Sequence, residues 1–208
     1  MKQGLCEIAC IIDRSGSMEA VRHDAIGGFN AFLDEQKKLP GQANMSLILF
    51  STGREVVYEN AAIDSVPPLT EQAYVPRGST ALLDAVGLTI DGIGKRLAQT
   101  PEDHRPERVI VAILTDGEEN ASRKYTRAQV AERIKHQQEQ YGWQFVFLAA
   151  NMDAFAEAAA LNIPLSNAAN FAATREGTQS AYRDMSATVA NLRAGPSSSA
   201  DSEWHIKH

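Results

Sequence analysis

Apolar residues along the chain gather in short, nearly continuous runs that alternate with longer segments of mixed polarity. These runs cover residues 5–12, 45–50, 109–114 and 143–149. Runs of this length with so little polar interruption are typical of strands that are buried on both faces, as in a parallel sheet. The first run, LCEIACII, contains a single charged residue and ends at Asp13. We therefore expect four central strands.

The segments between these runs show the spacing of amphipathic helices. Residues 18–38 carry a helical stripe, and Pro40-Gly41 ends it. Further helices are expected from residue 80 onward, over 126–140 and over 153–161. Thr174 predicts the N-cap of a last helix, with Glu176 in its first turn. The apolar stripe of that helix consists of Tyr182, Met185, Val189 and Leu192.

Three shorter features complete the pattern. Thr52-Gly53-Arg54 predicts a turn into an antiparallel strand over residues 55–58. Residues 64–79 contain three prolines and predict a long loop, of the length that often serves a function. A short edge strand is expected within residues 163–171.

Strands that alternate with helices predict a doubly wound, Rossmann-like α/β sheet with helices on both faces. We assign residues 1–194 to one domain and residues 195–208, which begin with Gly-Pro-Ser-Ser-Ser, to a mobile tail. In such sheets a ligand lies beyond the carboxyl ends of the strands, where the strand order reverses.

Composition narrows the class of partner. The net charge is −6, with 20 basic and 26 acidic residues, which argues against nucleic acid and against anionic membranes. No apolar run approaches the roughly 20 residues that span a bilayer, and no signal peptide is recognisable. We expect a cytoplasmic protein. Cys6 and Cys10 would lie roughly 13 Å apart on a strand, too far for a disulfide, so we expect two buried thiols.

Polar oxygen-bearing residues follow the predicted strands or face their ends. Asp13, Ser15 and Ser17 come directly after the first strand, Thr80 opens the middle helix, and Asp116 ends the 109–114 strand. All of these are hard oxygen ligands, which suit Mg²⁺, Mn²⁺ or Ca²⁺ better than Zn²⁺ or Cu²⁺. Hydroxyls carry no charge, so two carboxylates at most neutralise a divalent ion. If one of the two does not contact the ion directly, the site has a net positive charge. Such an ion would accept one more anionic oxygen, from a carboxylate or phosphate of another molecule.

These segments, DRSGS, GST and LTDGEEN, resemble the metal-ion-dependent adhesion site (MIDAS) of von Willebrand factor A domains. The resemblance covers roughly residues 5–193 and implies a six-stranded sheet whose only antiparallel strand lies around residues 55–58. It implies that Asp13, Ser15 and Ser17 bind the metal directly and that Thr80 and Asp116 bind it directly or through water. The open position would accept an Asp or Glu of a protein partner. The segment 150–154 and the last helix are similar to small stand-alone A domains of bacteria and phages, which often act beside ATPases or in stress and chelatase-like assemblies.

Several residues next to these motifs have roles that the sequence leaves open. Glu118 and Glu119 are interpreted as solvated loop charges, although either could reach the ion. Asp84 is expected to hold backbone of the site, and Arg14 and Arg77 to flank the open face and favour an acidic partner.

Enzyme motifs are missing from the sequence. The chain has no GxGxxG after its first strand, no P-loop, no HExxH and no GxSxG. We therefore expect a non-catalytic, Mg²⁺-dependent protein-binding module. The alternatives are a Mg²⁺- or Mn²⁺-dependent phosphohydrolase, with Glu118 or Glu119 as its base, and a scaffold whose metal is purely structural.

Overall fold

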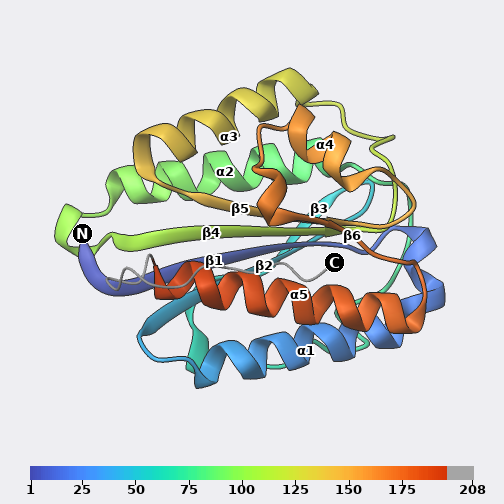
Figure 1. Cartoon of the computed structure of the whole chain (residues 1–208), viewed down its shortest axis with the longest axis horizontal. Coiled ribbons are helices and arrows are strands. Elements are labelled where there is room, and N and C mark those ends of the chain that lie inside the picture. Colours follow the sequence, from blue (N-terminus) through green and yellow to red (C-terminus); the bar gives the residue numbers. More distant parts are fainter. Residues whose placement is uncertain (196–208) are drawn as a thin grey trace, which may run out of the picture.

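A six-stranded sheet forms the centre of the protein in a computed structural model that describes residues 1–195 (Figure 1). The strand order is β3-β2-β1-β4-β5-β6. Only β3 runs antiparallel to its neighbour, and all other pairs are parallel. The predicted mixed sheet is therefore confirmed. The strands are β1 (Lys2–Asp13), β2 (Gln42–Phe50), β3 (Arg54–Ala62), β4 (Pro106–Thr115), β5 (Gln144–Ala149) and β6 (Ala168–Asn170).

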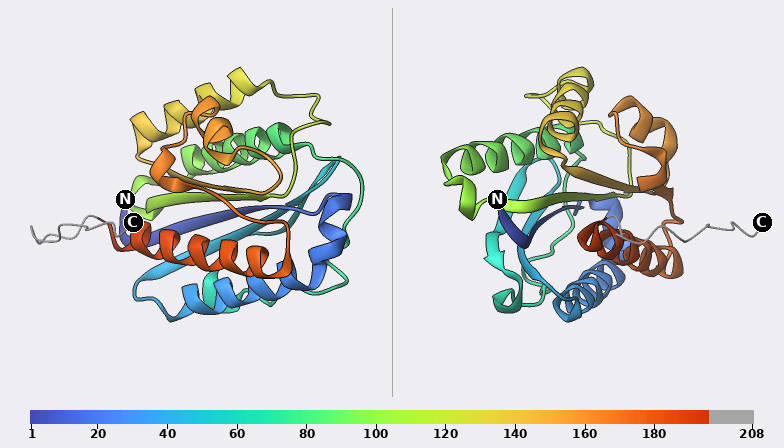
Figure 2. Two further views of the ribbon diagram at one scale, coloured as in Figure 1. Left: turned by 45° about the vertical axis from the view of Figure 1, so that its right-hand side comes forward. Right: turned by 60° about the vertical axis from the view of Figure 1, so that its left-hand side comes forward.

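Helices cover both faces of this sheet (Figure 1). The α-helices are α1 (Arg22–Lys38), α2 (Leu82–Gln99), α3 (Arg127–Tyr141), α4 (Ala154–Ala160) and α5 (Arg175–Ala194). Four 3-10 turns accompany them: η1 (Gly16–Val21), η2 (Ile63–Ser65), η3 (Glu102–His104) and η4 (Leu165–Asn167). One apolar cluster joins α1 and α5 to the sheet, and a second joins α2, α3 and α4 to its other face. Figure 2 shows the two helical layers from further directions.

The helix expected from residue 18 differs at its start. Its first residues form the 3-10 turn η1, and the α-helix begins at Arg22. The apolar stripe expected within residues 18–38 is buried in the structure. It consists of Val21, the last residue of η1, and Ala25, Phe29, Phe32 and Leu33 of α1. Strand β3 is also longer than expected. It continues to Ala62 through register shifts against β2, and Asn60 adopts a left-handed backbone there (φ 48°).

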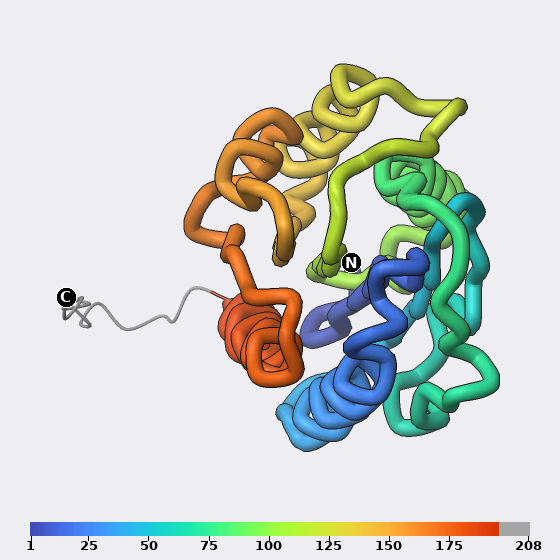
Figure 3. The backbone as a smooth tube through the Cα atoms, turned by 90° about the vertical axis from the view of Figure 1, so that its right-hand side faces the viewer, coloured from blue at the N-terminus to red at the C-terminus, as the bar shows by residue number. Residues whose placement is uncertain are grey.

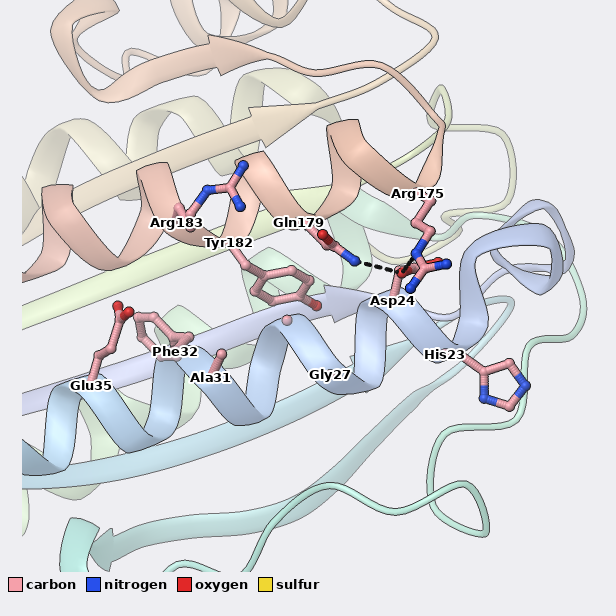
Figure 4. A pocket seen from close by; sticks show the side chains of 11 residues that line it. His23, Asp24, Gly27, Ala31, Phe32, Glu35, Arg175, Gln179, Tyr182 and Arg183 are labelled. Atoms are coloured by element: carbon pink, nitrogen blue, oxygen red, sulfur yellow. Dashed lines mark hydrogen bonds and ion pairs between the residues drawn. The ribbon is translucent and has the colours of Figure 1, made fainter.

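Helices α1 and α5 pack closely because Gly28 leaves room for an aromatic ring. A Cβ at Gly28 would lie 2.3 Å from Cδ2 of Tyr182. A groove of about 490 Å³ lies beside this contact. Figure 4 shows the side chains that line it, with Asp24 bound to Gln179 and Arg175. The charges at this end of the groove are therefore paired within the protein.

Helix α5 follows Thr174, whose side chain accepts from the N–H of Gly177, as the sequence predicted. Both cysteines are buried free thiols, also as predicted. Of the predicted mobile tail, residues 196–208 lie outside the described residues. Within residues 1–195, no helix combines the length and apolar character that crossing a membrane requires.

Candidate metal centre

The predicted ligands lie at one edge of the sheet because β1 and β4 are parallel neighbours. Asp13 is the last residue of β1, and Asp116 follows the last residue of β4. The register pairs Ile12 with Leu114, so both strands end at the same level. The strand order reverses between β1 and β4, where ligands of such sheets bind. Figure 3 looks onto this edge.

Three side chains form a hydrogen-bonded group at this edge. The hydroxyl of Ser17 donates to Oδ1 of Asp116 at 2.8 Å. The hydroxyl of Ser15 lies 3.4 Å from the same oxygen and 3.1 Å from the Ser17 hydroxyl. The turn after β1 therefore directs both serine oxygens toward the carboxylate that follows β4.

Asp13 lies beneath this group and is held by both of its carboxylate oxygens. Oδ1 accepts the N–H of Ser15 at 2.6 Å, and Oδ2 accepts the hydroxyl of Thr115 at 2.7 Å. The carbonyl of Asp13 accepts the hydroxyl of Tyr74 at 2.5 Å. The position of Asp13 is thus fixed from β4, from its own turn and from the loop before α2.

Thr80 reaches the same edge from that loop. Its N–H donates to Oδ1 of Asn120 at 2.9 Å, and the N–H of Asn120 donates to the Thr80 carbonyl at 3.0 Å. The Thr80 hydroxyl oxygen lies 3.7 Å from the place that a Cβ of Gly117 would occupy. Thr80 therefore lies beside the residue after Asp116. We call Asp13, Ser15, Ser17, Thr80 and Asp116 the oxygen cluster.

A glycine fixes the loop that carries Thr80. Gly78 adopts φ 72°, and a Cβ there would lie 2.5 Å from Oγ1 of Thr52. Its carbonyl accepts the N–H of Gly16 at 3.0 Å, which ties the loop to the turn after β1. Glycine is the residue that meets both the backbone and the space requirement here.

The two carboxylates of the oxygen cluster are buried, and neither has a counter-charge among the described residues. Asp13 is 0% exposed and Asp116 is 3% exposed. Among the described residues, no ion pair includes either of them. Burial raises the pKa of Asp13 to about 6, and the charge of Asp116 adds to this, while hydrogen bonds from Thr115 and Ser15 oppose it. Burial also raises the pKa of Asp116.

A divalent cation fits this arrangement on grounds of charge and of ligand chemistry. Two buried, uncompensated carboxylates are costly unless a cation accompanies them. The remaining donors are hydroxyls, which Mg²⁺ and Ca²⁺ accept and which soft metals do not favour. Within residues 1–195, no three His, Cys, Asp or Glu side chains gather closely enough to hold a metal. The oxygen cluster is therefore distinct in kind from a zinc site of nitrogen and sulfur ligands.

The expectation for Arg14 is wrong. Arg14 is 5% exposed, and its guanidinium binds Glu55 of β3 at 2.5 Å and the carbonyl of Ala73 at 3.3 Å. These two contacts hold its side chain between β3 and the loop before α2. Arg14 therefore fastens the loop to the sheet and offers no charge to a partner. Arg77 is exposed on the same loop.

The acidic residues after Asp116 differ in their surroundings. Oε1 of Glu119 accepts the N–H groups of Ala121 and Ser122, and Oε2 accepts the N–H of Leu83 and the Ser122 hydroxyl. Glu119 thus holds its own loop and the first turn of α2, contrary to its interpretation as a solvated charge. Glu118 is exposed, as expected.

Asp84 also has a structural role. Its carboxylate accepts the N–H groups of Arg123, Lys124 and Tyr125 at 2.8–2.9 Å. Although burial raises the pKa of Asp84, these three donors outweigh it and the pKa is lowered. Asp84 holds the backbone of the segment before α3, in keeping with the expected backbone role.

Four residues that support the oxygen cluster were not predicted: Tyr74, Thr115, Asn120 and Asn151. Thr115 could have been suggested by its place at the end of the 109–114 strand, next to Asp116. Asn151 donates from its side chain to the carbonyl of Asp116 at 2.8 Å. Nothing in the hydrophobic pattern singles out Tyr74 or Asn120, because both lie in irregular loops.

Comparison of the fold with solved structures finds von Willebrand factor A-type relatives. Proximal thread matrix protein 1 from the mussel byssus superposes with a TM-score of 0.59 at 16% identity, over 90% of this chain and 46% of that one. A second structure of that protein, described as having a zinc-occupied MIDAS motif, gives a TM-score of 0.57 at 16% identity, over 89% of this chain and 46% of that one. A von Willebrand factor type A protein from Catenulispora acidiphila gives 0.56 at 18% identity, over 87% and 42%.

The chain spans less than half the length of these structural relatives. No protein-family model matches the sequence, and no curated protein is significantly similar to it. The likeness to solved structures shows a fold of the von Willebrand factor A type, and the oxygen cluster lies at the carboxyl edge of its sheet.

Proposed function

We propose that residues 1–194 act as one metal-dependent protein-binding domain without catalytic activity. The observation that carries this proposal is the pair of buried carboxylates, Asp13 and Asp116, which lie beside the serine hydroxyls and have no counter-charge among the residues that the structure describes. A divalent cation supplies that charge. The zinc-occupied MIDAS of the mussel protein, on the same fold, supports this assignment.

Within this proposal, Asp13, Ser15, Ser17, Thr80 and Asp116 hold the cation, directly or through water. We propose Mg²⁺ as the resident ion, with Mn²⁺ and Ca²⁺ as substitutes, because the donors are uncharged hydroxyls and carboxylates. A cation held there would supply positive charge for an anionic oxygen of a partner. With only two carboxylates among its ligands, it would retain affinity for an additional carboxylate.

The proposed partner is a protein that presents an Asp or Glu to the ion. Ser17 and the loop residue Ser79 are exposed, so the edge is open to solvent beside the oxygen cluster. An ATPase-containing assembly is our candidate for the partner, and the cytoplasm for the location. The net charge of −6 leaves nucleic acid and anionic membranes outside the proposal.

Thermal unfolding tests the metal part of the proposal. An ion that binds only the folded state at about 100 times its Kd adds about 2.7 kcal/mol, or roughly 5–10 °C in Tm at this chain length. We expect this rise with Mg²⁺ relative to EDTA, and none in Asp116→Asn. Identical melting of the wild-type protein in EDTA, Mg²⁺, Mn²⁺ and Ca²⁺ would refute the metal site.

Affinity capture tests the partner. The immobilised wild-type chain should retain a protein from lysate of its source cells in Mg²⁺ and release it in EDTA. Asp116→Asn should retain none, whereas the surface variant Asp34→Asn should behave as wild type. Retention that is equal in Mg²⁺ and EDTA would leave the cation without a role in binding.

A further inference from the structure

Asn151 lies in the connection between β5 and α4, and its side chain reaches out of that connection. Its Nδ2 donates to the backbone carbonyl of Asp116 at 2.8 Å, across 35 positions of sequence. Asp116 lies just beyond β4, so its carbonyl has left the ladder that pairs β4 with β5, which ends at Thr115 and Ala149. The Asn151 amide therefore holds the chain one residue beyond the last paired residue of β4.

The backbone of Asn151 is held in an unusual conformation. Its φ is 56°, in the left-handed region that L-residues other than Asn and Asp rarely occupy. The neighbouring polar side chains serve the local chain: Asp153 caps α4 through the N–H groups of Phe155 and Ala156, and Asn170 accepts the N–H of Ala154. Among these three polar residues, only Asn151 directs its side chain to Asp116. Left-handed residues of this kind are often found at functional sites.

The position of the Asp116 backbone determines where its carboxylate meets the two serines. Oδ1 of Asp116 lies 2.8 Å from the Ser17 hydroxyl and 3.4 Å from the Ser15 hydroxyl. A shift of the segment after β4 changes both distances and the geometry available to an ion. A donor that anchors this segment acts on the ion through Asp116, without touching it.

From these contacts we infer that Asn151 is a positioning residue, which sets the affinity of the cation site by fixing the backbone of Asp116. The inference rests on the proposed function, since it concerns the same cation. Residues that orient a metal ligand typically contribute 10- to 100-fold to affinity. Because Asn151 holds the backbone of Asp116 and not its carboxylate, the lower figure, about tenfold, applies.

Two substitutions separate the lost hydrogen bond from the backbone conformation. Asn151→Gly removes the amide and tolerates φ 56°, whereas Asn151→Ala removes the amide and is strained there. Isothermal titration with MgCl₂ should show Kd raised about tenfold in both variants. Unfolding in EDTA should show Asn151→Ala less stable than Asn151→Gly. A purely structural role would instead make Mg²⁺ affinity follow stability, with only the alanine variant impaired.

Asn162 provides a matched control. It is also left-handed (φ 59°), and its Nδ2 also donates to a distant backbone carbonyl, that of Ala131 at 3.1 Å. Asn162→Gly should leave the Mg²⁺ affinity unchanged. A wild-type Kd in Asn151→Gly, or an equal loss in Asn162→Gly, would overturn the inference alone. A wild-type protein that binds no Mg²⁺ would overturn the proposed function and, with it, this inference.

Discussion

The hydroxyl of Ser17 donates to the carboxylate of Asp116 at 2.8 Å, although the two residues lie 99 positions apart in the sequence. The contact joins the turn after β1 to the segment after β4, and these are the strands between which the strand order reverses. Both oxygens belong to groups that bind hard cations well. The contact therefore brings together two of the residues that we propose as ligands of the cation.

Substitution of Asp13 by Asn should stabilise the protein in EDTA. The pKa of Asp13 rises from 3.8 to about 6 on burial, so ionised Asp13 costs the folded state at most about 3 kcal/mol at neutral pH. Asn removes this cost and keeps a carbonyl oxygen for the N–H of Ser15. We expect Tm to rise by several degrees in EDTA at pH 7.5.

Mg²⁺ should reverse that order, because only the wild-type protein gains stability from the ion. The control is Asp34→Asn, which makes the same charge change on the exposed face of α1 and should alter neither Tm. If Asp13→Asn proves less stable than the wild type in EDTA, the carboxylate does not lie in the costly environment described above.

The stabilising effect of Mg²⁺ should depend on pH. The folded-state pKa of Asp13 without metal, about 6, lies above its unfolded value of 3.8. The metal-free protein therefore gains stability as pH falls through about 6, while a proton increasingly competes with the ion for Asp13. The difference in Tm between Mg²⁺ and EDTA should be large at pH 7.5 and much smaller at pH 5.5. A difference that grows toward low pH would contradict this assignment.

Tyr74→Phe should destabilise the protein because it removes the hydrogen bond to the Asp13 carbonyl. Tyr74 is 0% exposed, so the change leaves a buried carbonyl without this donor, at a cost of about 1–3 kcal/mol. Tyr182, also buried, has a hydroxyl that makes no hydrogen bond within residues 1–195, and its ring lies beside α1 in Figure 4. Tyr182→Phe should therefore be neutral or slightly stabilising. Equal effects of the two changes in denaturant unfolding would show that the Tyr74 hydroxyl contributes nothing specific.

The sheet, its order of elements and the place of the oxygen cluster could be predicted because each depends on a local pattern. Nearly continuous apolar runs indicate the buried strands, and the polar residues that follow a run mark the edge of the sheet. Asp13 and Asp116 were identifiable in this way. Thr80 was identifiable from its place at the start of the middle helix, facing the strand ends, and the resemblance then supplied the roles of all five residues.

The supporting contacts could not be predicted, because they depend on how irregular loops fold back. Arg14 is polar and lies next to Asp13, yet its partners Glu55 and Ala73 hold its side chain between β3 and the loop before α2. Glu119 follows the same logic, with its carboxylate turned toward the start of α2. Asn151 adopts a left-handed backbone in the connection between β5 and α4, and no local sequence pattern specifies this conformation.

The absence of turnover is the prediction that separates a binding domain from a metal-dependent phosphohydrolase. A hydrolase requires a base that reaches a water on the ion at about 3 Å or through one further water. Both carboxylate oxygens of Glu119 accept hydrogen bonds from its loop and from α2, which leaves Glu118 as the candidate among the two. Glu118 is exposed and faces a cavity of about 350 Å³ that Arg127 and Glu157 also line.

For a binding domain, we expect purified wild-type protein to show no phosphatase or phosphodiesterase activity with Mn²⁺ or Mg²⁺. Glu118→Gln should behave identically to wild type in the same screen and in melting experiments. Glu119→Gln should lower Tm in EDTA as well as in Mg²⁺, because its hydrogen bonds do not involve the ion. Activity that copurifies with the wild-type chain, disappears in Glu118→Gln and in Asp116→Asn, and survives in Asp34→Asn would make the chain an enzyme. Its base would then be Glu118, an exposed carboxylate that accepts no hydrogen bond from the described part of the chain, since Glu119 holds its own loop and the first turn of α2.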